Sequence, residues 1–462
     1  MGRAVASTIH VIAAPYPGRG HINPMLMLSR LLASRLPPPA AVTVVLTEEW
    51  LSLLGGAASA PPGVNFRTVS NVIPSEKGRA ADFAGFLEAV YTKLESPFEQ
   101  LLDGLEVPAT AIVADTFLPW AVDVGKRRGI PVCSFFTMSA TMYSALLFFD
   151  RLPVQAGGTV PVALAGEAEP TKAEDELVSK YIDGHQSLRL SDLKNSFNPL
   201  EKSGQLALNA ATQSTKAQCI IFTSAFDLEP RIITALRSSL TFPVLPIGPT
   251  IPCSGLQDHS EGVGYLAFLD SQPQSSVLYV SLGSFLSVSM RQMDEIVLGL
   301  QASNAKFLLV ARDESSRLQE MIGGRGGMVC AWCDQLKVLL HPSVGGFFTH
   351  CGWNSTMEAA FAGVPALTFP IMFDQLVDDR LLVDDWGVGL AIRDGVGSGV
   401  VVGREKIADL VRRVMGLEGD ERREMEKKSA ILSEACKAAV QEGGSSSVNL
   451  SDLVKLLSPA KE

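Results

Sequence analysis

The sequence is poor in cysteine, has no excess of basic residues and has no long apolar run, and each shortage excludes a class of protein. Its seven cysteines are an odd number spread over 462 residues. No disulfide framework is therefore expected, and the pattern is typical of a reduced, intracellular protein. Lys and Arg number 39 against 49 Asp and Glu, a formal net charge of −10. An acidic chain disfavours nucleic acid and anionic lipid as partners.

Membrane insertion and secretion are also disfavoured. The first residues hold only a short apolar run, broken by Pro15 and Pro17, without the apolar core and cleavage site of a signal peptide, and no run reaches membrane-spanning length. Hydrophobic residues make up 47% and charged residues 19%, which is ordinary globular composition. We therefore expect a cytoplasmic monomer of two or three domains, with no stable membrane insertion.

Short β-branched runs alternate with longer amphipathic stretches, a pattern typical of βα units around parallel sheets. The expected strands are 10–14, 41–47, 111–115, 131–136, 219–223, 244–247, 277–281, 307–310, 345–349 and 366–369. Stretches 80–103 and 404–441 are expected to be helical, and 156–183 to be a surface excursion. A Gly-Pro pair and a polar stretch over 248–264 indicate a linker. The sequence therefore predicts an α/β chain of two doubly wound halves, 1–247 and 265–440, with ligands at the carboxyl ends of the strands.

The segment GRGHIN (18–23) follows the first expected strand and opens a helix. It nearly matches the dinucleotide-binding fingerprint, with Asn23 where the third glycine belongs, and Glu48 after the second strand is placed like a ribose-binding acid. A nicotinamide-dependent oxidoreductase is therefore an open alternative. His21 suggests another role, because a helix N-terminus favours the neutral, base-competent imidazole. The plainer interpretation of His21 is a helix cap.

Asp115 ends the apolar strand 111–115. A carboxylate at the carboxyl end of a central strand points into the ligand crevice, where it can hold an imidazole by Nδ1 and stabilise the imidazolium. The structural alternative is an N-cap for a helix that begins near Phe117.

The stretch from Trp332 to Gln375 is the densest in polar and aromatic groups. A helix expected to start near Asn354, directly after a strand and His350, aims free N–H groups at an anion such as a diphosphate. Trp332 offers a flat face for a base, and Glu358 an acceptor for ribose hydroxyls. Each residue also has a structural interpretation, as core, helix-start charge or cap. Their joint placement at adjacent strand ends favours a ligand site.

This stretch resembles the plant secondary product glycosyltransferase box, the donor signature of plant family 1 UDP-glycosyltransferases. It runs from Trp to Gln over 44 positions, the length typical of the family, and carries HCGWNS (350–355), GVP (363–365) and Asp374-Gln375. The likeness extends over nearly the whole chain. Segment 15–24 resembles the family's catalytic-histidine segment, Asp115 falls where the family keeps its second catalytic residue, and 280–284 resembles its phosphate-side loop.

The resemblance implies a GT-B fold: two Rossmann-like domains, an acceptor-binding 1–247 and a donor-binding 265–440, with a last helix (441–462) crossing back to the first domain. The donor-binding residues that it implies are Trp332 for uracil; Cys333 through its backbone; Gln335 and Glu358 for ribose; His350, Asn354, Ser355 and Ser284 for the diphosphate; and Trp353, Asp374 and Gln375 for the sugar. A terminal Gln in the box is associated with glucose as the donor sugar.

The implied reaction is metal-independent transfer of glucose from UDP-glucose, with inversion, to a hydroxyl of a phenolic, flavonoid or terpenoid acceptor. UDP-glucose is a co-substrate and no cofactor or metal is expected. His21 would be the general base and Asp115 its partner. The residues expected to line the acceptor pocket are Phe117, Trp120, Phe136, Met138 and Tyr143. Another UDP-sugar, C-glycosylation and a non-catalytic UDP-sugar binder remain alternatives.

The box departs from the family pattern at Cys333-Asp334, where Ala-Pro is common. Asp334 is a good N-cap for the following helix and replaces the proline's role in starting it. The change also creates a C-x-x-C pair, Cys330 and Cys333. A zinc or redox site there is a minor alternative, because no second Cys/His pair at suitable spacing accompanies it.

Overall fold

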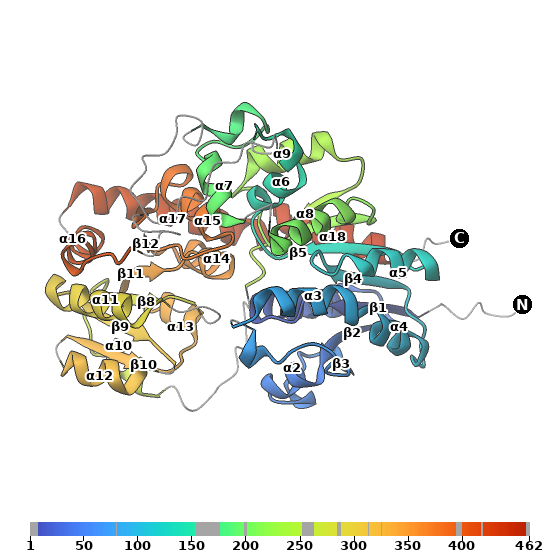
Figure 1. Ribbon diagram of the computed structural model, residues 1–462, viewed down its shortest axis with the longest axis horizontal. Coiled ribbons are helices and arrows are strands. Elements are labelled where there is room, and N and C mark those ends of the chain that lie inside the picture. The colour runs from blue at the N-terminus through green and yellow to red at the C-terminus, as the bar shows by residue number, and fades with distance from the viewer. Residues whose placement is uncertain are drawn as a thin grey trace, which may run out of the picture. The chain divides into compact units, whose positions relative to one another are not determined.

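The computed structural model describes residues 8–79, 81–153, 176–197, 201–251, 263–283, 288–312, 314–324, 326–393, 400–416 and 419–458. The chain divides into two compact units (Figure 1). Unit 1 comprises Met1–Arg151, Asn198–Pro252 and Ala438–Glu462, and unit 2 comprises Leu152–Phe197 and Cys253–Lys437.

Unit 1 is built on a seven-stranded parallel sheet of order β3-β2-β1-β4-β5-β6-β7. Its strands are β1 (Ile9–Ala14), β2 (Ala40–Thr47), β3 (Val64–Val69), β4 (Ala111–Asp115), β5 (Val132–Phe136), β6 (Cys219–Phe222) and β7 (Val244–Pro246). Its helices are α1 (Arg19–Arg35), α2 (Glu48–Leu53), α3 (Phe83–Lys93), α4 (Glu95–Asp103), α5 (Trp120–Arg128), α6 (Ala140–Leu147), α8 (Lys202–Ser214), α9 (Pro230–Ser239) and α18 (Ser445–Leu457). The strand order reverses between β1 and β4, which is the topological switch point where such sheets bind ligands.

One face of the unit 1 sheet is covered by α1 and α18. Alternate residues of a strand point to the same face, and positions three or four apart share one face of a helix. The cluster that results includes fully buried Val11 of β1, Val44 of β2, Leu28 of α1 and Leu453 of α18. The C-terminal helix α18 is therefore part of the unit 1 core, and Asn449 also donates a side-chain hydrogen bond to the Pro246 carbonyl oxygen (2.7 Å).

Unit 2 is built on a six-stranded parallel sheet of order β10-β9-β8-β11-β12-β13. Its strands are β8 (Val277–Ser281), β9 (Lys306–Val310), β10 (Gly327–Cys330), β11 (Val344–Thr349), β12 (Ala366–Thr368) and β13 (Gly389–Ala391). Its helices are α7 (Leu190–Ser196), α10 (Val263–Asp270), α11 (Met290–Ser303), α12 (Ser315–Ile322), α13 (Gln335–Leu339), α14 (Trp353–Ala362), α15 (Gln375–Arg380), α16 (Arg404–Met415) and α17 (Asp420–Val440). Here the order reverses between β8 and β11.

Apolar clusters lie on both faces of the unit 2 sheet. On one face, Val280 of β8 packs with Leu300 of α11 and Val411 of α16. On the other face, Tyr279 of β8 packs with Phe347 of β11 and with residues of α10, α13 and α14. Successive residues of β8 thus enter opposite cores, so the strand is apolar at nearly every position, as expected for a parallel strand buried on both faces.

The structure differs from the expected elements in three ways. Strands β3, β10 and β13 were not expected, stretch 80–103 is divided into α3 and α4 at Leu94, and stretch 404–441 is divided into α16 and α17. Most of the expected excursion and of the expected linker lies outside the described residues. Among the described residues, no helix combines the length and apolar character that crossing a membrane requires.

The predicted first domain included residues 152–197, but the structure groups this segment with unit 2. Helix α7 contacts α15 of unit 2, and a salt bridge is part of this contact. The Arg380 guanidinium of α15 donates two hydrogen bonds to the Asp192 carboxylate of α7 (2.9 and 3.1 Å), and both side chains are largely buried. Asp192 also accepts from the Arg189 backbone N–H (2.8 Å) at the start of α7, so the same carboxylate begins one helix and joins it to another.

Candidate active site

A histidine–aspartate pair lies at the switch point of the unit 1 sheet. His21 is in the first turn of α1, which follows β1, and Asp115 is the last residue of the neighbouring strand β4. The His21 Nδ1 atom lies 2.8 Å from Asp115 Oδ2. The Asp115 side chain is fully buried, whereas 17% of the His21 side chain is exposed. The sequence predicted both residues, and the structure brings them into contact.

Thr137, which the sequence did not single out, is a second partner of the same ring nitrogen. It follows β5, the strand next to β4, and its Oγ1 atom lies 2.8 Å from His21 Nδ1. A carboxylate accepts and does not donate, so the Nδ1 position carries the proton and donates to Asp115. A neutral His21 ring therefore keeps the lone pair on Nε2, the nitrogen that a general base needs free.

Asp115 does not cap a helix in the structure, which was the alternative interpretation of this residue. Helix α5 begins at Trp120 with Pro119 as its N-cap. The second oxygen of Asp115, Oδ1, instead accepts a hydrogen bond from the Phe117 backbone N–H (2.9 Å). Asp115 thus orients the imidazole with one oxygen and is itself oriented by the chain through the other.

A buried arginine holds the loop that carries His21. Arg79 donates to the Pro17 carbonyl oxygen (3.2 Å) and pairs with Glu76 (3.0 Å). A Cβ atom at Gly18 would lie 2.5 Å from Arg79 Nη1, so a larger residue there would require the guanidinium to shift. The pKa of Arg79 is lowered by burial, against the opposing charge of Glu76.

Three of the five expected acceptor residues belong to one aromatic cluster beside His21. The Phe117 ring meets His21 edge-on (5.8 Å between centroids) and stacks on Phe136 (5.9 Å), which contacts Tyr143 (5.2 Å). Phe136 and Tyr143 are fully buried, whereas 9% of Phe117 is exposed and Met138 is half-buried. Phe117 is therefore the member of this cluster that contacts His21, with Phe136 stacked on it and Tyr143 packed against Phe136.

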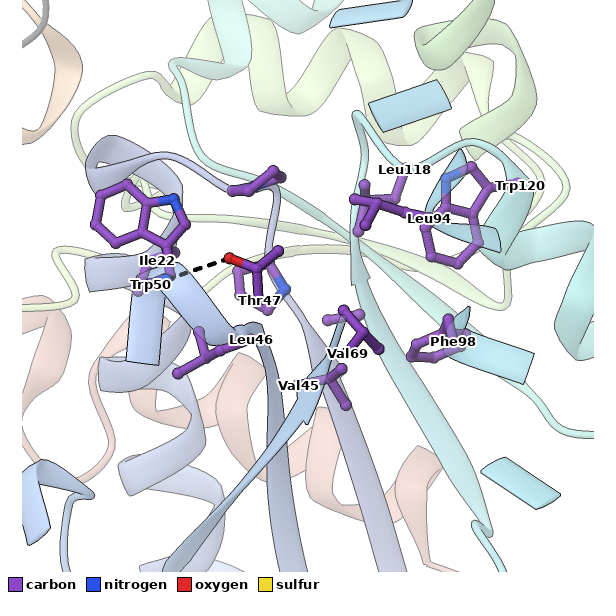
Figure 2. A pocket seen from close by; sticks show the side chains of 13 residues that line it. Ile22, Val45, Leu46, Thr47, Trp50, Val69, Leu94, Phe98, Leu118 and Trp120 are labelled. Atoms are coloured by element: carbon purple, nitrogen blue, oxygen red, sulfur yellow. Dashed lines mark hydrogen bonds between the residues drawn. The ribbon is translucent and has the colours of Figure 1, made fainter. Parts of the chain in front are cut away.

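Trp120 does not join this cluster. Its ring packs against Phe98 (5.3 Å) and its Nε1–H donates to the Val90 carbonyl oxygen (3.2 Å). Figure 2 shows it with Leu94 and Phe98 on one side of an apolar cavity and Trp50 on the other. The cavity measures about 30 Å³, room for one or two water molecules. The Trp120 ring thus packs against Phe98 and lines this cavity, and its expected acceptor contact stays a prediction.

The donor-binding candidates surround the carboxyl ends of the unit 2 strands. At the switch point, His350 follows β11, and its ring lies between Gly283, beyond β8, and Gly352. A Cβ atom at Gly283 would lie 2.7 Å from His350 Nε2, and one at Gly352 would lie 2.6 Å away. Only glycine at both positions leaves room for the ring. Burial lowers the pKa of His350 to about 4, so the ring is neutral near pH 7.

Helix α14 begins beside this ring. Cys351 has a φ of +67°, a conformation that non-glycine residues rarely adopt and that is typical of functional sites. It turns the chain into α14, whose first residues are Trp353, Asn354 and Ser355. Trp353 is buried and packs against Trp386 (6.4 Å). The N–H groups of this first helical turn are suited to an anion.

A hydrogen-bonded network joins α13 to α14. The Gln335 side-chain amide donates to Ser355 Oγ (3.0 Å) and to Glu358 Oε2 (2.7 Å), and its Oε1 accepts from the buried Tyr279 hydroxyl (3.2 Å). Burial raises the pKa of Glu358 to about 7, although the hydrogen bond from Gln335 opposes the shift. The predicted cap is also present, since Asp334 accepts from the Lys337 backbone N–H (3.1 Å).

The remaining candidates lie at the neighbouring strand ends. Trp332 follows β10, and 48% of it is exposed. Asp374 and Gln375 follow β12 and are buried; Gln375 Oε1 accepts from the Ile371 and Met372 backbone N–H groups (2.7 and 3.1 Å). Ser284 lies outside the described residues. Across the part of the chain that is described, no three His, Cys, Asp or Glu side chains gather as a metal site would require.

Comparison with known proteins decides the family. Residues 204–395 match the family model described as UDP-glucoronosyl and UDP-glucosyl transferase. UDP-glycosyltransferase 87A2 of Arabidopsis thaliana is 44% identical over 453 residues, 96% of each chain. The chain belongs to the plant family 1 UDP-glycosyltransferases. Membership decides against the nicotinamide-dependent alternative for segment 18–23.

Solved structures of other UDP-glycosyltransferases show the same fold. Phytolacca americana UGT2, solved with UDP-2-fluoro-glucose and pterostilbene, is 26% identical with a TM-score of 0.79, covering 97% of this chain and 99% of that one. Medicago truncatula UGT71G1, solved with UDP-glucose, is 26% identical with a TM-score of 0.80, covering 98% of both chains. The two parallel-sheet units of this UDP-glycosyltransferase are thus the Rossmann-like domains of a GT-B fold.

Proposed function

We propose that this UDP-glycosyltransferase transfers glucose from UDP-glucose to a hydroxyl of a small, largely apolar plant metabolite, a phenolic, flavonoid or terpenoid, with inversion and without a metal ion. The observation that carries the proposal is the His21–Asp115 contact at 2.8 Å, which leaves Nε2 of a neutral ring as a base. Unit 1 binds the acceptor and unit 2 the donor.

His21 Nε2 takes the proton of the acceptor hydroxyl as the oxygen attacks C1 of the sugar from the face opposite UDP. The C1–O bond to the diphosphate breaks, UDP leaves, and an α-linked donor yields a β-glucoside. Asp115 stabilises the imidazolium that forms. The negative charge that grows on the leaving diphosphate is met by the α14 N-terminus, His350, Asn354 and Ser355.

The other donor contacts that we propose are those that the family resemblance implies. Trp332 stacks on uracil and Cys333 contacts it through the backbone, Gln335 and Glu358 bind ribose, and Trp353, Asp374 and Gln375 face the sugar. The exposure of Trp332 supports the uracil assignment, and the Gln335–Glu358 hydrogen bond supports the ribose assignment. Glucose is favoured by Gln375 and by the UDP-glucose bound to Medicago truncatula UGT71G1.

An apolar acceptor is favoured by the Phe117 ring, which lies edge-on to His21. The aromatic pterostilbene bound to Phytolacca americana UGT2 is a molecule of the character that an aromatic contact suits.

The direct test offers UDP-glucose, UDP-galactose and UDP-glucuronate with a panel of phenolics, flavonoids and terpenoids. We expect products heavier by one hexose, formed fastest from UDP-glucose, with the β configuration by NMR, and cleaved by β-glucosidase as O-glucosides are. Resistance to cleavage would identify C-glycosylation instead. UDP-glucose binding without product from any acceptor would contradict the proposal in favour of a non-catalytic binder.

The glycine on the α14 side of His350 provides a test of the diphosphate contact. Gly352→Ala places a methyl group against the imidazole, 2.6 Å from Nε2 before any relaxation. Displacing a donor to a charged ligand removes about 1.5–3 kcal/mol, so we expect UDP-glucose to bind at least about tenfold more weakly. Calorimetric titration measures this loss. The control is Gly264→Ala in α10, where the new methyl makes only an ordinary contact; equal binding by both variants would remove His350 from the diphosphate site.

Glu358 makes donor binding depend on pH. In the free protein its pKa is about 7, so the carboxyl is mostly protonated at pH 6. Ribose hydroxyls that donate to it favour the carboxylate, which lowers the pKa in the complex. Binding therefore releases a proton, and affinity for UDP-glucose rises with pH through 7, by about tenfold at most per unit.

Titration calorimetry in buffers of different ionisation enthalpy counts this proton. UDP-glucose is the ligand to use, because its diphosphate, esterified at both ends, does not titrate in this range. Glu358→Gln is the control, since an amide has no proton to release. Equal proton release by both proteins would show that another group is responsible.

A further inference from the structure

Two cysteines flank the exposed tryptophan of the donor site. Cys330 is the last residue of β10 and is half-buried, and Cys333 lies three residues later, just before α13, with 7% exposed. Both are free thiols, and they lie close enough for each to shift the pKa of the other. Trp332, with 48% exposed, lies between them in the chain.

The inner cysteine is also connected to the ribose-binding candidates. Cys333 Sγ lies 3.4 Å from the Tyr279 hydroxyl, which donates to Gln335 Oε1 at 3.2 Å. Gln335 in turn donates to Ser355 and Glu358. In the reduced protein, the Tyr279 hydroxyl therefore connects the Cys333 sulfur to Gln335, and through Gln335 to Ser355 and Glu358. Oxidation of Cys333 is expected to disturb these contacts.

We propose that Cys330 and Cys333 form a reversible intramolecular disulfide whose formation weakens binding of the uridine part of the donor. The effect on binding rests on the proposed function. A bond across Cys-Ala-Trp-Cys constrains the backbone on both sides of Trp332 and removes the Cys333 thiol from Tyr279. The disulfide thus acts on the uracil side and on the ribose side of the same site.

The chemistry needs a two-electron oxidant, for which hydrogen peroxide serves. The Cys330 thiolate attacks one peroxide oxygen, the O–O bond breaks, and the hydroxide that leaves takes up a proton to give water and a sulfenic acid. The Cys333 sulfur attacks the sulfenic sulfur; the S–S bond forms, the S–O bond breaks, and a second water leaves with the Cys333 proton. Two thiols are oxidised and one peroxide is reduced to two waters.

The environments of the two thiols suit these roles. The hydrogen bond from Cys333, together with one from the Trp332 backbone, lowers the pKa of Cys330, the more exposed of the two, and a thiolate is the attacking form. The hydrogen bond to Cys330 and burial raise the pKa of Cys333, which suits the resolving position. By contrast, Cys133 and Cys219 are free cysteines at neighbouring positions of β5 and β6. They are buried in the unit 1 core, with 2% and 0% exposed.

The experiment exposes the full-length protein to a few equivalents of hydrogen peroxide. Alkylation under denaturing conditions and peptide mass spectrometry then identify the linked cysteines, and calorimetry measures UDP-glucose affinity before oxidation, after it and after dithiothreitol. We expect a Cys330–Cys333 link, binding weaker by about fivefold or more, and recovery on reduction. Cys330→Ser is expected to bind UDP-glucose as the reduced protein does and to lose the sensitivity. The matched control, Cys436→Ala in α17, is expected to keep it.

Three results would overturn the proposal: no link between Cys330 and Cys333, a link that forms without any change in UDP-glucose affinity, or equal peroxide sensitivity in Cys330→Ser. Failure of the proposed function gives a different result, in which the reduced protein does not bind UDP-glucose. In that case, mass spectrometry still detects the link, and so does a change in tryptophan fluorescence that is absent from Trp332→Phe. If no link forms, the disulfide is refuted.

Discussion

Replacing His21 by alanine is expected to abolish most glucosyl transfer while leaving UDP binding intact. The ring nitrogen that would take the acceptor proton is lost, and general-base catalysis of this kind contributes on the order of 10²–10⁴-fold. Because His21 belongs to unit 1 and the proposed donor residues belong to unit 2, the affinity for UDP is expected to stay within about twofold of the original, less than one weak contact is worth. Turnover at saturating UDP-glucose, together with calorimetric titration of UDP, measures the two quantities separately.

The chain contains a matched control for this variant in a second histidine–aspartate pair. His341 Nε2 lies 3.1 Å from Asp270 Oδ1 in unit 2, and the Asp270 side chain is exposed. His341→Gln therefore removes a His–Asp contact of similar length that has no place in the proposed chemistry, and we expect transfer to be unchanged. Full turnover by His21→Ala would refute the assignment of the base.

The strands that lie deepest in the sheets were the easiest to predict. Parallel strands that are covered on both faces need apolar side chains on both faces, and β4 and β5 are accordingly apolar at almost every position. Both strands lie where the sequence predicted them. β3 escaped notice because it is an edge strand, whose Asn65 and Arg67 interrupt the apolar pattern. β13 has three residues and begins with Gly389, so it carries too little signal to be distinguished from a loop.

The grouping of α7 with unit 2 could not be predicted from local pattern. It involves the salt bridge between Arg380 and Asp192. These residues are 188 positions apart, and nothing in the sequence indicates that they pair. The same holds for the space that the His350 ring occupies. Its shape depends on Gly283 and Gly352, two glycines of a kind that also occurs in ordinary turns.

The candidate site was predictable where a strand end and a family motif coincide. His21 and Asp115 follow adjacent strands, so their contact could be inferred from topology once the sheet was assumed. Thr137 also follows a central strand, β5, and this position was the available signal. Threonine is common after strands and does not by itself indicate catalysis, so only the 2.8 Å contact distinguishes it. For Trp120, the structure shows packing against Phe98, and the expected acceptor contact stays a prediction.

Asp115→Asn is expected to lower turnover nearly as much as loss of the histidine itself, although it changes a single atom. The Phe117 backbone N–H donates to Oδ1 (2.9 Å), so an asparagine keeps its oxygen there and presents its NH₂ group to His21. Nδ1 must then accept, the ring proton moves to Nε2, and the base is lost. We expect turnover to fall by about 10²-fold or more.

The tautomer gives this prediction a readout that a structural defect would not produce. ¹⁵N NMR of the histidine rings is expected to report Nδ1–H in the original protein and Nε2–H in Asp115→Asn. Thr137→Val is the matched comparison: it removes one of the two Nδ1 partners but leaves the carboxylate, so Nδ1–H is retained and the loss of turnover is smaller. An unchanged tautomer and undiminished turnover in Asp115→Asn would reduce Asp115 to a support for the turn at Phe117. An exchanged tautomer with lost turnover would establish that this carboxylate determines which ring nitrogen carries out the chemistry.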